Sequence, residues 1–181
     1  MYSILLAVFS IITLKAFPFA PIQITLYDFL IEGYPSFILS FEPNKERIRG
    51  AFLPAVIRRS LPYAAIILIH AILIAWCSPW IGIPTAAAMA VTYGIAGFAG
   101  ILALIKACRP FNKLRMLICS TVVIGFYAAV LLFSSMIELE SFTVASFVLF
   151  AGLVTISLPL TRIVSHWISE YPLEKIAWFQ K

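Results

Sequence analysis

Long apolar runs separated by short polar connections make up nearly the whole chain. A helix needs about 20 predominantly apolar residues to cross a bilayer, and runs near that length recur along the sequence. The predicted transmembrane segments cover residues 2–19, 22–41, 61–77, 85–105, 116–136 and 143–160. The pattern therefore predicts an all-α integral membrane protein with about six transmembrane helices, which form a single membrane domain over residues 1–181 and end in a tail at 161–181.

The composition favours the same class. Hydrophobic residues make up 62% of the 181 residues and charged residues only 12%, so there is too little polar surface to coat a water-soluble globule. In a soluble protein, a net charge of +5 would suggest nucleic acid, but here the basic residues stand in the short connections. The predicted partner is the lipid bilayer, with no nucleic acid.

The basic residues alternate in a way that predicts topology. Five lie in Lys45–Arg59, four in Lys106–Arg115 and three after Thr161, whereas connections 78–84 and 137–142 carry none. Because basic residues accumulate on the cytoplasmic side, a multi-pass cell-membrane protein with both termini cytoplasmic is predicted. The tryptophans stand at or beyond segment ends, as interfacial anchors do: Trp76, Trp80, Trp167 and Trp178.

Small residues recur at three- and four-residue spacing in the fourth segment. They are Gly94, Gly97 and Gly100, together with Ala90 and Ala96. Such a face lets a neighbouring helix approach closely. It predicts a packing face inside the bundle, and the alternative is a dimer interface.

Two carboxylic acids, Asp28 and Glu32, stand near the middle of the second segment, at the expected bilayer midplane. Their four-residue spacing places both on one face of a helix, about one turn apart. An ionised acid at the bilayer centre costs about 2.5–3.5 kcal/mol, and a second carboxylate nearby raises that cost. The pair therefore predicts an ion or proton path. The alternative is that both acids are protonated or hydrogen-bonded inside the bundle.

Gly33 and Pro35 follow the pair directly. Proline removes a backbone N–H and disfavours helical geometry at the preceding residue, so the second helix is predicted to be unwound near Gly33 to Pro35. Unwound backbone exposes carbonyl oxygens, and carboxylates with carbonyls are the ligands that hard cations prefer. A metal site at Asp28 and Glu32, with calcium as the favoured ion, is the hypothesis that follows.

Other chemistry-bearing residues form no pattern. His70, near the middle of the third segment, fits either a proton relay or a packed, hydrogen-bonded histidine. The cysteines Cys77, Cys108 and Cys119 lack paired spacing. No phosphate-binding loop, catalytic triad or metalloprotease helix occurs, so neither a catalytic residue nor a cofactor-binding residue is predicted.

The second segment and its exit resemble the sixth membrane segment of P-type cation-transporting ATPases. The resemblance rests on Pro21-Ile22-Gln23, then Asp28, then Glu32-Gly33-Tyr34-Pro35-Ser36, then Phe41-Glu42-Pro43-Asn44. Four further predicted helices follow, as they do in that family. The chain is thus similar to the C-terminal transmembrane half of a pump, and is closest to a bacterial branch of the calcium type.

This resemblance implies roles for individual residues. Asp28 and Glu32 match cation ligands, and Gly33 with Pro35 matches the unwound turn. Glu32 stands where many members have Asp, and Ile31 where calcium pumps often have a hydroxyl, so the ion's identity and stoichiometry stay open.

The resemblance also bears on catalysis and partners. The phosphorylation motif Asp-Lys-Thr-Gly-Thr and a nucleotide-binding domain do not occur in the sequence, so magnesium-ATP would act only through an N-terminal catalytic half or another membrane subunit as partner. The alternatives to a pump are a free-standing membrane scaffold or subunit, and a small proton- or cation-coupled carrier.

Overall fold

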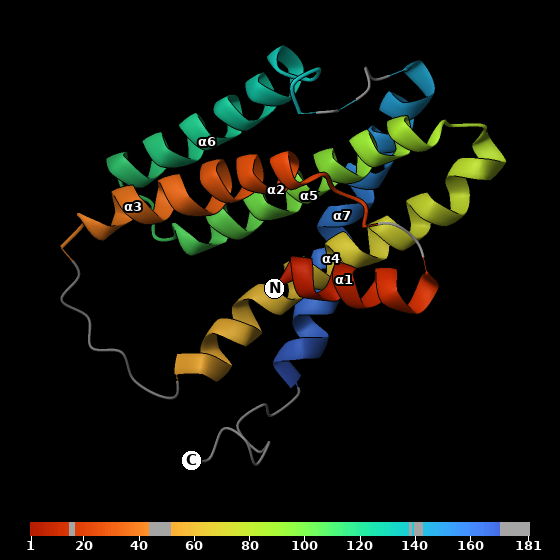
Figure 1. The fold of residues 1–181 in the computed structure, drawn as a ribbon. Helices are drawn as coiled ribbons and strands as arrows, with labels where there is room; N and C mark the ends of the chain where they lie inside the picture. Colours follow the sequence, from red (N-terminus) through yellow and green to blue (C-terminus); the bar gives the residue numbers. More distant parts are fainter. Residues whose placement is uncertain (15–16, 44–51, 138, 140–142, 171–181) are drawn as a thin grey trace.

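The computed structural model describes residues 1–14, 17–43, 52–137, 139 and 143–170. Within these ranges the chain is helical and contains no strand, which confirms the all-α class. The helices, drawn in Figure 1, are α1 (Tyr2–Thr13), α2 (Pro21–Tyr27), the π-helix η1 (Asp28–Gly33), α3 (Tyr34–Ser40), α4 (Phe52–Ile81), α5 (Thr85–Ala107), α6 (Lys113–Leu132) and α7 (Val144–Glu170).

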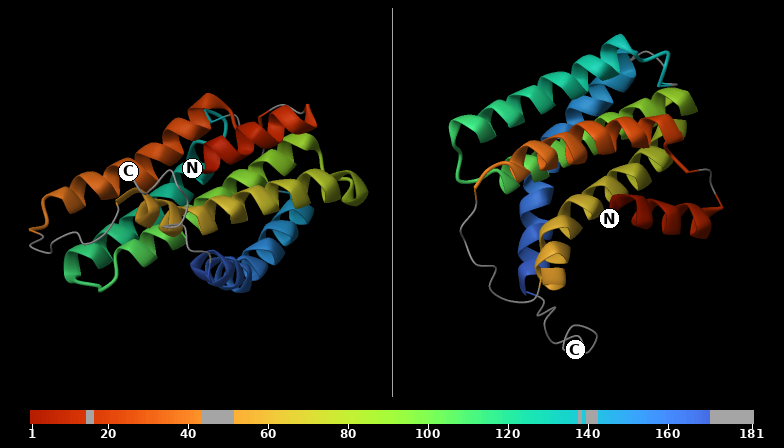
Figure 2. Two further views of the ribbon diagram at one scale, coloured as in Figure 1. Left: turned by 90° about the horizontal axis from the view of Figure 1, so that it is seen from below. Right: turned by 60° about the vertical axis from the view of Figure 1, so that its left-hand side comes forward.

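The helices pack around α5. Figure 2 shows α4 and α5 as a middle layer, with α1–α3 on one side and α7 on the other. Helix α4 packs against α1, α5 and α7, while η1 packs against α5 and α6. The apolar stretch of α5 is 72% buried and that of α7 only 17%. The most buried of the long helices, α5, is thus the helix that contains the glycines and alanines of the predicted packing face.

Among the described residues, four helices are long and apolar enough to cross a membrane. They span Ala55–Ile81, Thr85–Ala107, Lys113–Leu132 and Val144–Ile168. Helix α1 is apolar but has only 12 residues, and it ends at Leu14 in a left-handed conformation (φ 53°). The structure therefore supports four of the six predicted spans, and the first two segments stay predictions.

Helices α4 and α7 extend well beyond their predicted bounds. Helix α4 extends beyond the predicted 61–77 and contains both Pro62 and Pro79. Helix α7 continues to Glu170, through the first part of the predicted tail. Prolines are tolerated inside membrane helices because neighbouring groups satisfy the backbone they disturb, so they do not end α4.

The second predicted segment is a continuous helix instead of an unwound one. It consists of α2, η1 and α3, with seven, six and seven residues in turn. The N–H of Tyr34 bonds to the carbonyl of Phe29, five residues earlier, which is π-helical pairing. An added Cβ at Gly33 would lie 3.3 Å from the Asp28 carbonyl oxygen. Gly33 and Pro35 are therefore accommodated by a widened turn, and unwinding is not confirmed.

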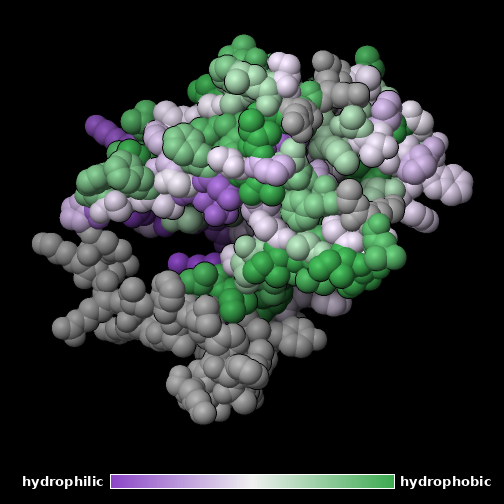
Figure 3. Space-filling view, viewed as in Figure 1, coloured by the Kyte–Doolittle hydropathy of each residue, from purple (hydrophilic) through white to green (hydrophobic). Residues whose placement is uncertain are grey.

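The outer surface carries many large apolar side chains. Figure 3 shows hydrophobic residues over much of the face formed by α1 and the upper helices. Three of the four tryptophans are strongly exposed, with exposed fractions of 70% for Trp76, 84% for Trp80 and 68% for Trp167. These positions agree with interfacial anchoring. The fourth, Trp178, lies outside the described residues.

The small residues of α5 form an internal packing face. Gly94, Gly97 and Gly100 are all buried. An added Cβ at Gly97 would collide with the ring of Phe126 in α6, and one at Gly100 would collide with Tyr27 in α2. The predicted packing face is confirmed. Because α6 and α2 cover it within one chain, it is not available to a second copy.

Candidate cation site

The two acids of the second segment lie on the π-helical segment. Asp28 is the first residue of η1 and Glu32 the fifth, so they share one face of the widened helix. Both side chains are exposed in this chain, and neither makes an ion pair with any described residue. Asp28 accepts a hydrogen bond from the hydroxyl of Tyr2 in α1, at 3.1 Å.

Glu32 borders a cavity of about 680 Å³ between α1, η1, α4 and α5. Its wall also carries the hydroxyl-bearing residues Tyr2, Ser36, Ser60 and Tyr63. Asp28 is not part of this wall, but its hydrogen bond to Tyr2 connects it to the cavity. The structure thus gathers one carboxylate and several hydroxyl groups around one space, with the second carboxylate beside them.

An aromatic cluster holds Tyr2 in place. The Tyr2 ring lies 4.8 Å from that of Tyr27 and 6.4 Å from that of Phe19, measured between centroids. Tyr93 packs against Phe19 at 5.8 Å and against Phe126 at 5.5 Å. Such tilted and edge-to-face pairs are favourable beyond their buried area. The hydroxyl that contacts Asp28 is therefore carried by a fixed ring.

Gln23 fixes the beginning of the acid-bearing helix. Its side chain is buried, accepts a hydrogen bond from the Ala20 N–H at 3.1 Å, and donates to the Ile137 carbonyl at 2.9 Å. The backbone carbonyl of Gln23 accepts a hydrogen bond from the Tyr93 hydroxyl at 3.0 Å. The amide therefore caps α2 and ties it to the segment that follows α6, which gives the Pro-x-Gln pattern a structural role.

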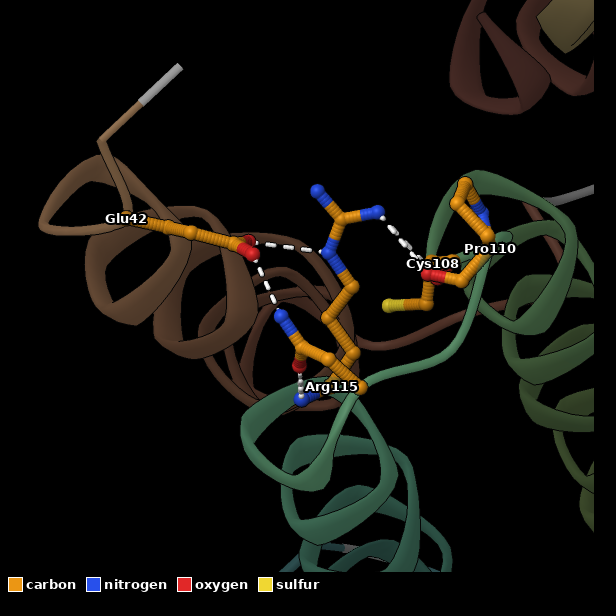
Figure 4. A network of polar contacts seen from close by, with 5 residues as sticks. Glu42, Cys108, Pro110 and Arg115 are labelled. Atoms are coloured by element: carbon orange, nitrogen blue, oxygen red, sulfur yellow. Dashed lines mark hydrogen bonds and ion pairs between the residues drawn. The ribbon is translucent and has the colours of Figure 1, made fainter.

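A polar network holds the other end of this helix (Figure 4). Glu42 pairs with Arg115 Nε at 2.8 Å and accepts from Asn112 Nδ2 at 2.6 Å. The same arginine donates to the Pro110 carbonyl at 3.1 Å. The Arg115 hydrogen bond, with help from Asn112, lowers the pKa of Glu42. The contact therefore stabilises the fold above the carboxyl's ordinary pKa, and this contribution is lost as pH falls through the lowered value.

His70 lies away from the acids. It is fully buried between α4 and α7, with Nδ1 2.8 Å from the Ile66 carbonyl and Nε2 3.2 Å from the Ser157 hydroxyl. It does not border the cavity beside Glu32. Both ring nitrogens have partners, which favours the packed, hydrogen-bonded interpretation over a proton relay.

The oxygen donors near the acids fall short of a complete site. Calcium prefers about six to eight oxygen ligands. Among the described residues, no group of three or more His, Cys, Asp or Glu side chains is close enough to hold a metal. Two carboxylates and neighbouring hydroxyls are chemically suited to a hard cation. A full coordination shell requires further oxygens.

Most of the chain has a recognisable relative. It is 33% identical over 138 residues to a probable cation-transporting ATPase of Streptococcus pneumoniae, a match that covers 72% of this chain. The chain is homologous to part of a cation-transporting ATPase. It spans only 18% of that ATPase's length. Together with the apolar helices, this similarity supports a membrane part of a cation pump.

Shorter matches involve calcium-transporting ATPases. Fifty-one residues are 39% identical to such ATPases of Mycolicibacterium smegmatis and Mycobacterium tuberculosis, covering 28% of this chain and 6% of each relative. No protein-family model matches the chain. No solved structure matches it significantly.

The sequence pattern predicts that Asp28 and Glu32 lie on one helical face, and the structure places them so on η1. It gives no indication of Tyr2, Ser60 or Tyr63, which reach the site from α1 and α4. No local signal marks them, because they meet the acids only through packing between helices. The placement of a cation on the two carboxylates stays a proposal.

Proposed function

We propose that this chain is the C-terminal membrane part of a P-type cation pump, in which Asp28 and Glu32 supply ligands to a transported divalent cation. The observation that carries the proposal is the match to a cation-transporting ATPase over 72% of the chain. The position of Glu32 on a hydroxyl-lined cavity, with Asp28 beside it, agrees with such a role. The remaining helices support the acid-bearing helix.

Calcium is the ion we favour. Carboxylate and hydroxyl oxygens suit hard cations, and the chain is similar over a short stretch to ATPases named as calcium-transporting. The chain itself holds no cofactor in this proposal. Magnesium-ATP acts through a catalytic half, which is the proposed partner and which also brings the additional oxygen ligands that the cation needs.

Two other functions belong to different classes. In a free-standing scaffold or subunit, Asp28 would have only a structural role, which is to accept the hydrogen bond from Tyr2. A small proton- or cation-coupled carrier would transport without ATP. Neither accounts for the similarity to an ATPase over most of the chain.

Calcium-dependent phosphorylation separates these functions. Membranes from cells that carry the complete pump are expected to form a phosphoenzyme from magnesium-ATP when calcium is present, and to lose it when this chain is deleted. Restoring the chain in the same cells should restore the signal. Phosphoenzyme formation that is independent of the chain would reject the pump function and leave the scaffold.

We also propose a cell-membrane location with the basic connections and both termini in the cytoplasm. In a background without native cysteines, Phe111→Cys lies in a basic connection and Thr85→Cys at the opposite end of α5, and both positions are exposed. An impermeant maleimide added to intact cells should label Thr85→Cys alone, whereas opened membranes should allow labelling of both. Labelling of Phe111→Cys from outside would reverse the topology.

A further inference from the structure

A second cavity lies between α4, α5 and α7, apart from the acids. It measures about 540 Å³ and shares only Tyr63 with the cavity beside Glu32. Four basic residues line it: Lys106 in the last turn of α5, Arg109 just after that helix, and Arg162 and His166 in α7. An adjoining hollow of about 310 Å³ shares Lys106 and Arg109 and adds Arg59. Basic residues from three helices thus meet at one end of the bundle.

No carboxylate is among the described residues that line this cavity. The ion pair between Glu42 and Arg115 lies elsewhere. Lys106 Nζ is held beside the Ser165 hydroxyl at 3.5 Å and 5.9 Å from the centre of the Tyr63 ring. Lys106, Arg109 and Arg162 therefore gather positive charge with no acid among the described lining residues, which favours an anion between them.

The lining suits a phosphate group. Arginine offers planar paired donors to phosphate oxygens, and lysine adds a compact charge. Ser165 places a hydroxyl group in the same wall beside Lys106 Nζ, whereas the Thr161 hydroxyl donates to the Ser157 carbonyl. Guanidinium and ammonium donors, with the Ser165 hydroxyl beside them, match a phosphate better than a carboxylate or a neutral ligand.

The surroundings favour a lipid as the source of that phosphate. The wall also contains Leu102, Ile105 and Leu158, which can contact acyl chains below a headgroup. Trp167, next to His166, is strongly exposed, as an interfacial tryptophan would be. Basic pockets between transmembrane helices on the cytoplasmic side are suited to anionic headgroups.

We infer that the cavity bounded by Lys106, Arg109, Arg162 and His166 binds the headgroup of an anionic phospholipid. The lipid bridges the end of α5 and α7, so it stabilises the packing of α7, the least buried of the long helices. This role is independent of the cation site. It requires only that these helices sit in a membrane.

The test uses the full chain in nanodiscs and phosphatidylglycerol as the probe. Native mass spectrometry should find one phosphatidylglycerol retained per wild-type chain after exchange into phosphatidylcholine. Arg162→Gln and Lys106→Gln should each lower its apparent affinity roughly fivefold, the loss expected for one basic contact at an anionic membrane surface. The matched control is Lys113→Gln, which removes an exposed charge at the start of α6, outside this cavity, and should retain the lipid.

Two results would overturn the inference. Equal retention of phosphatidylglycerol by wild type, Arg162→Gln and Lys106→Gln would show that the cavity does not select it. Displacement of the lipid by millimolar inorganic phosphate, with equal protection against thermal unfolding, would identify a free-anion site instead. Circular dichroism of each variant checks that the helices are retained, so a loss of lipid is not a loss of fold.

Discussion

Replacing Asp28 by asparagine or Glu32 by glutamine is expected to abolish calcium-stimulated phosphorylation of the complete pump at ordinary calcium concentrations. Each change removes one negative charge and keeps the side-chain volume, so it separates ion binding from packing. Loss of an outer-shell partner alone weakens metal affinity about 10–100-fold. Loss of a direct ligand is therefore expected to raise the calcium concentration for half-maximal phosphorylation by roughly 100-fold or more.

The measurement is phosphoenzyme formed from ATP across a range of free calcium. Glu42→Gln is the matched control, because it makes the same chemical change in the same segment but beyond the end of α3, where Glu42 contacts Arg115. Its calcium dependence should equal that of wild type. Unchanged calcium dependence in both Asp28→Asn and Glu32→Gln would reject the site and leave a structural role for the acids.

The sequence predicts the long apolar helices well. The predicted 85–105 corresponds to α5 at Thr85–Ala107, because a continuous apolar run follows directly after Pro84 and ends at Lys106. The prediction for α4 is too short because Arg59 and Pro79, just outside the predicted 61–77, suggest an end to the helix. The helix continues because long basic side chains can reach the interface while their backbone stays helical.

The geometry around the acids is less accessible from the sequence. Gly33 and Pro35 correctly mark an irregularity, but the choice between unwinding and a π-helical turn depends on packing against α5 and α6. The hydrogen bond from Tyr2 to Asp28 joins residues 26 positions apart and has no local signal. Local chemistry therefore locates the acids, while tertiary packing selects the groups that surround them.

The largest stability effects are expected at the glycines of α5. At Gly97 an added Cβ would lie 2.9 Å from Phe126 Cδ1 and nearer still to other atoms of that ring. Phe126 is fully buried and packs against Tyr93, so its ring has little room to move. Overpacking costs about 1–3 kcal/mol, which exceeds the roughly 0.5–1 kcal/mol that alanine gains over glycine in a helix. Gly97→Ala should therefore destabilise the chain.

Gly100→Ala should destabilise it as well, and should also disturb the acids. Its added Cβ would lie 2.9 Å from Ile31 Cγ2 and close to Tyr27, the two buried residues that hold η1 against α5. In the complete pump, Gly100→Ala is thus expected to raise the calcium concentration needed for half-maximal phosphorylation. Gly97→Ala, whose added methyl group contacts α6, should affect mainly stability. Thermal unfolding of the full chain in nanodiscs and calcium-dependent phosphorylation measure the two effects separately.

The matched controls are Gly125→Ala in α6 and Gly152→Ala in α7, where an added Cβ would meet nothing within 4 Å. Both should leave the midpoint of thermal unfolding unchanged or raise it, because only the helix-forming advantage of alanine remains. A fall in all four variants would indicate a general intolerance of alanine. Tolerance of alanine at Gly97 and Gly100 would mean that α6 and η1 do not approach α5 as closely as the structure places them, and the position of Asp28 and Glu32 beside the cavity would have to change with them.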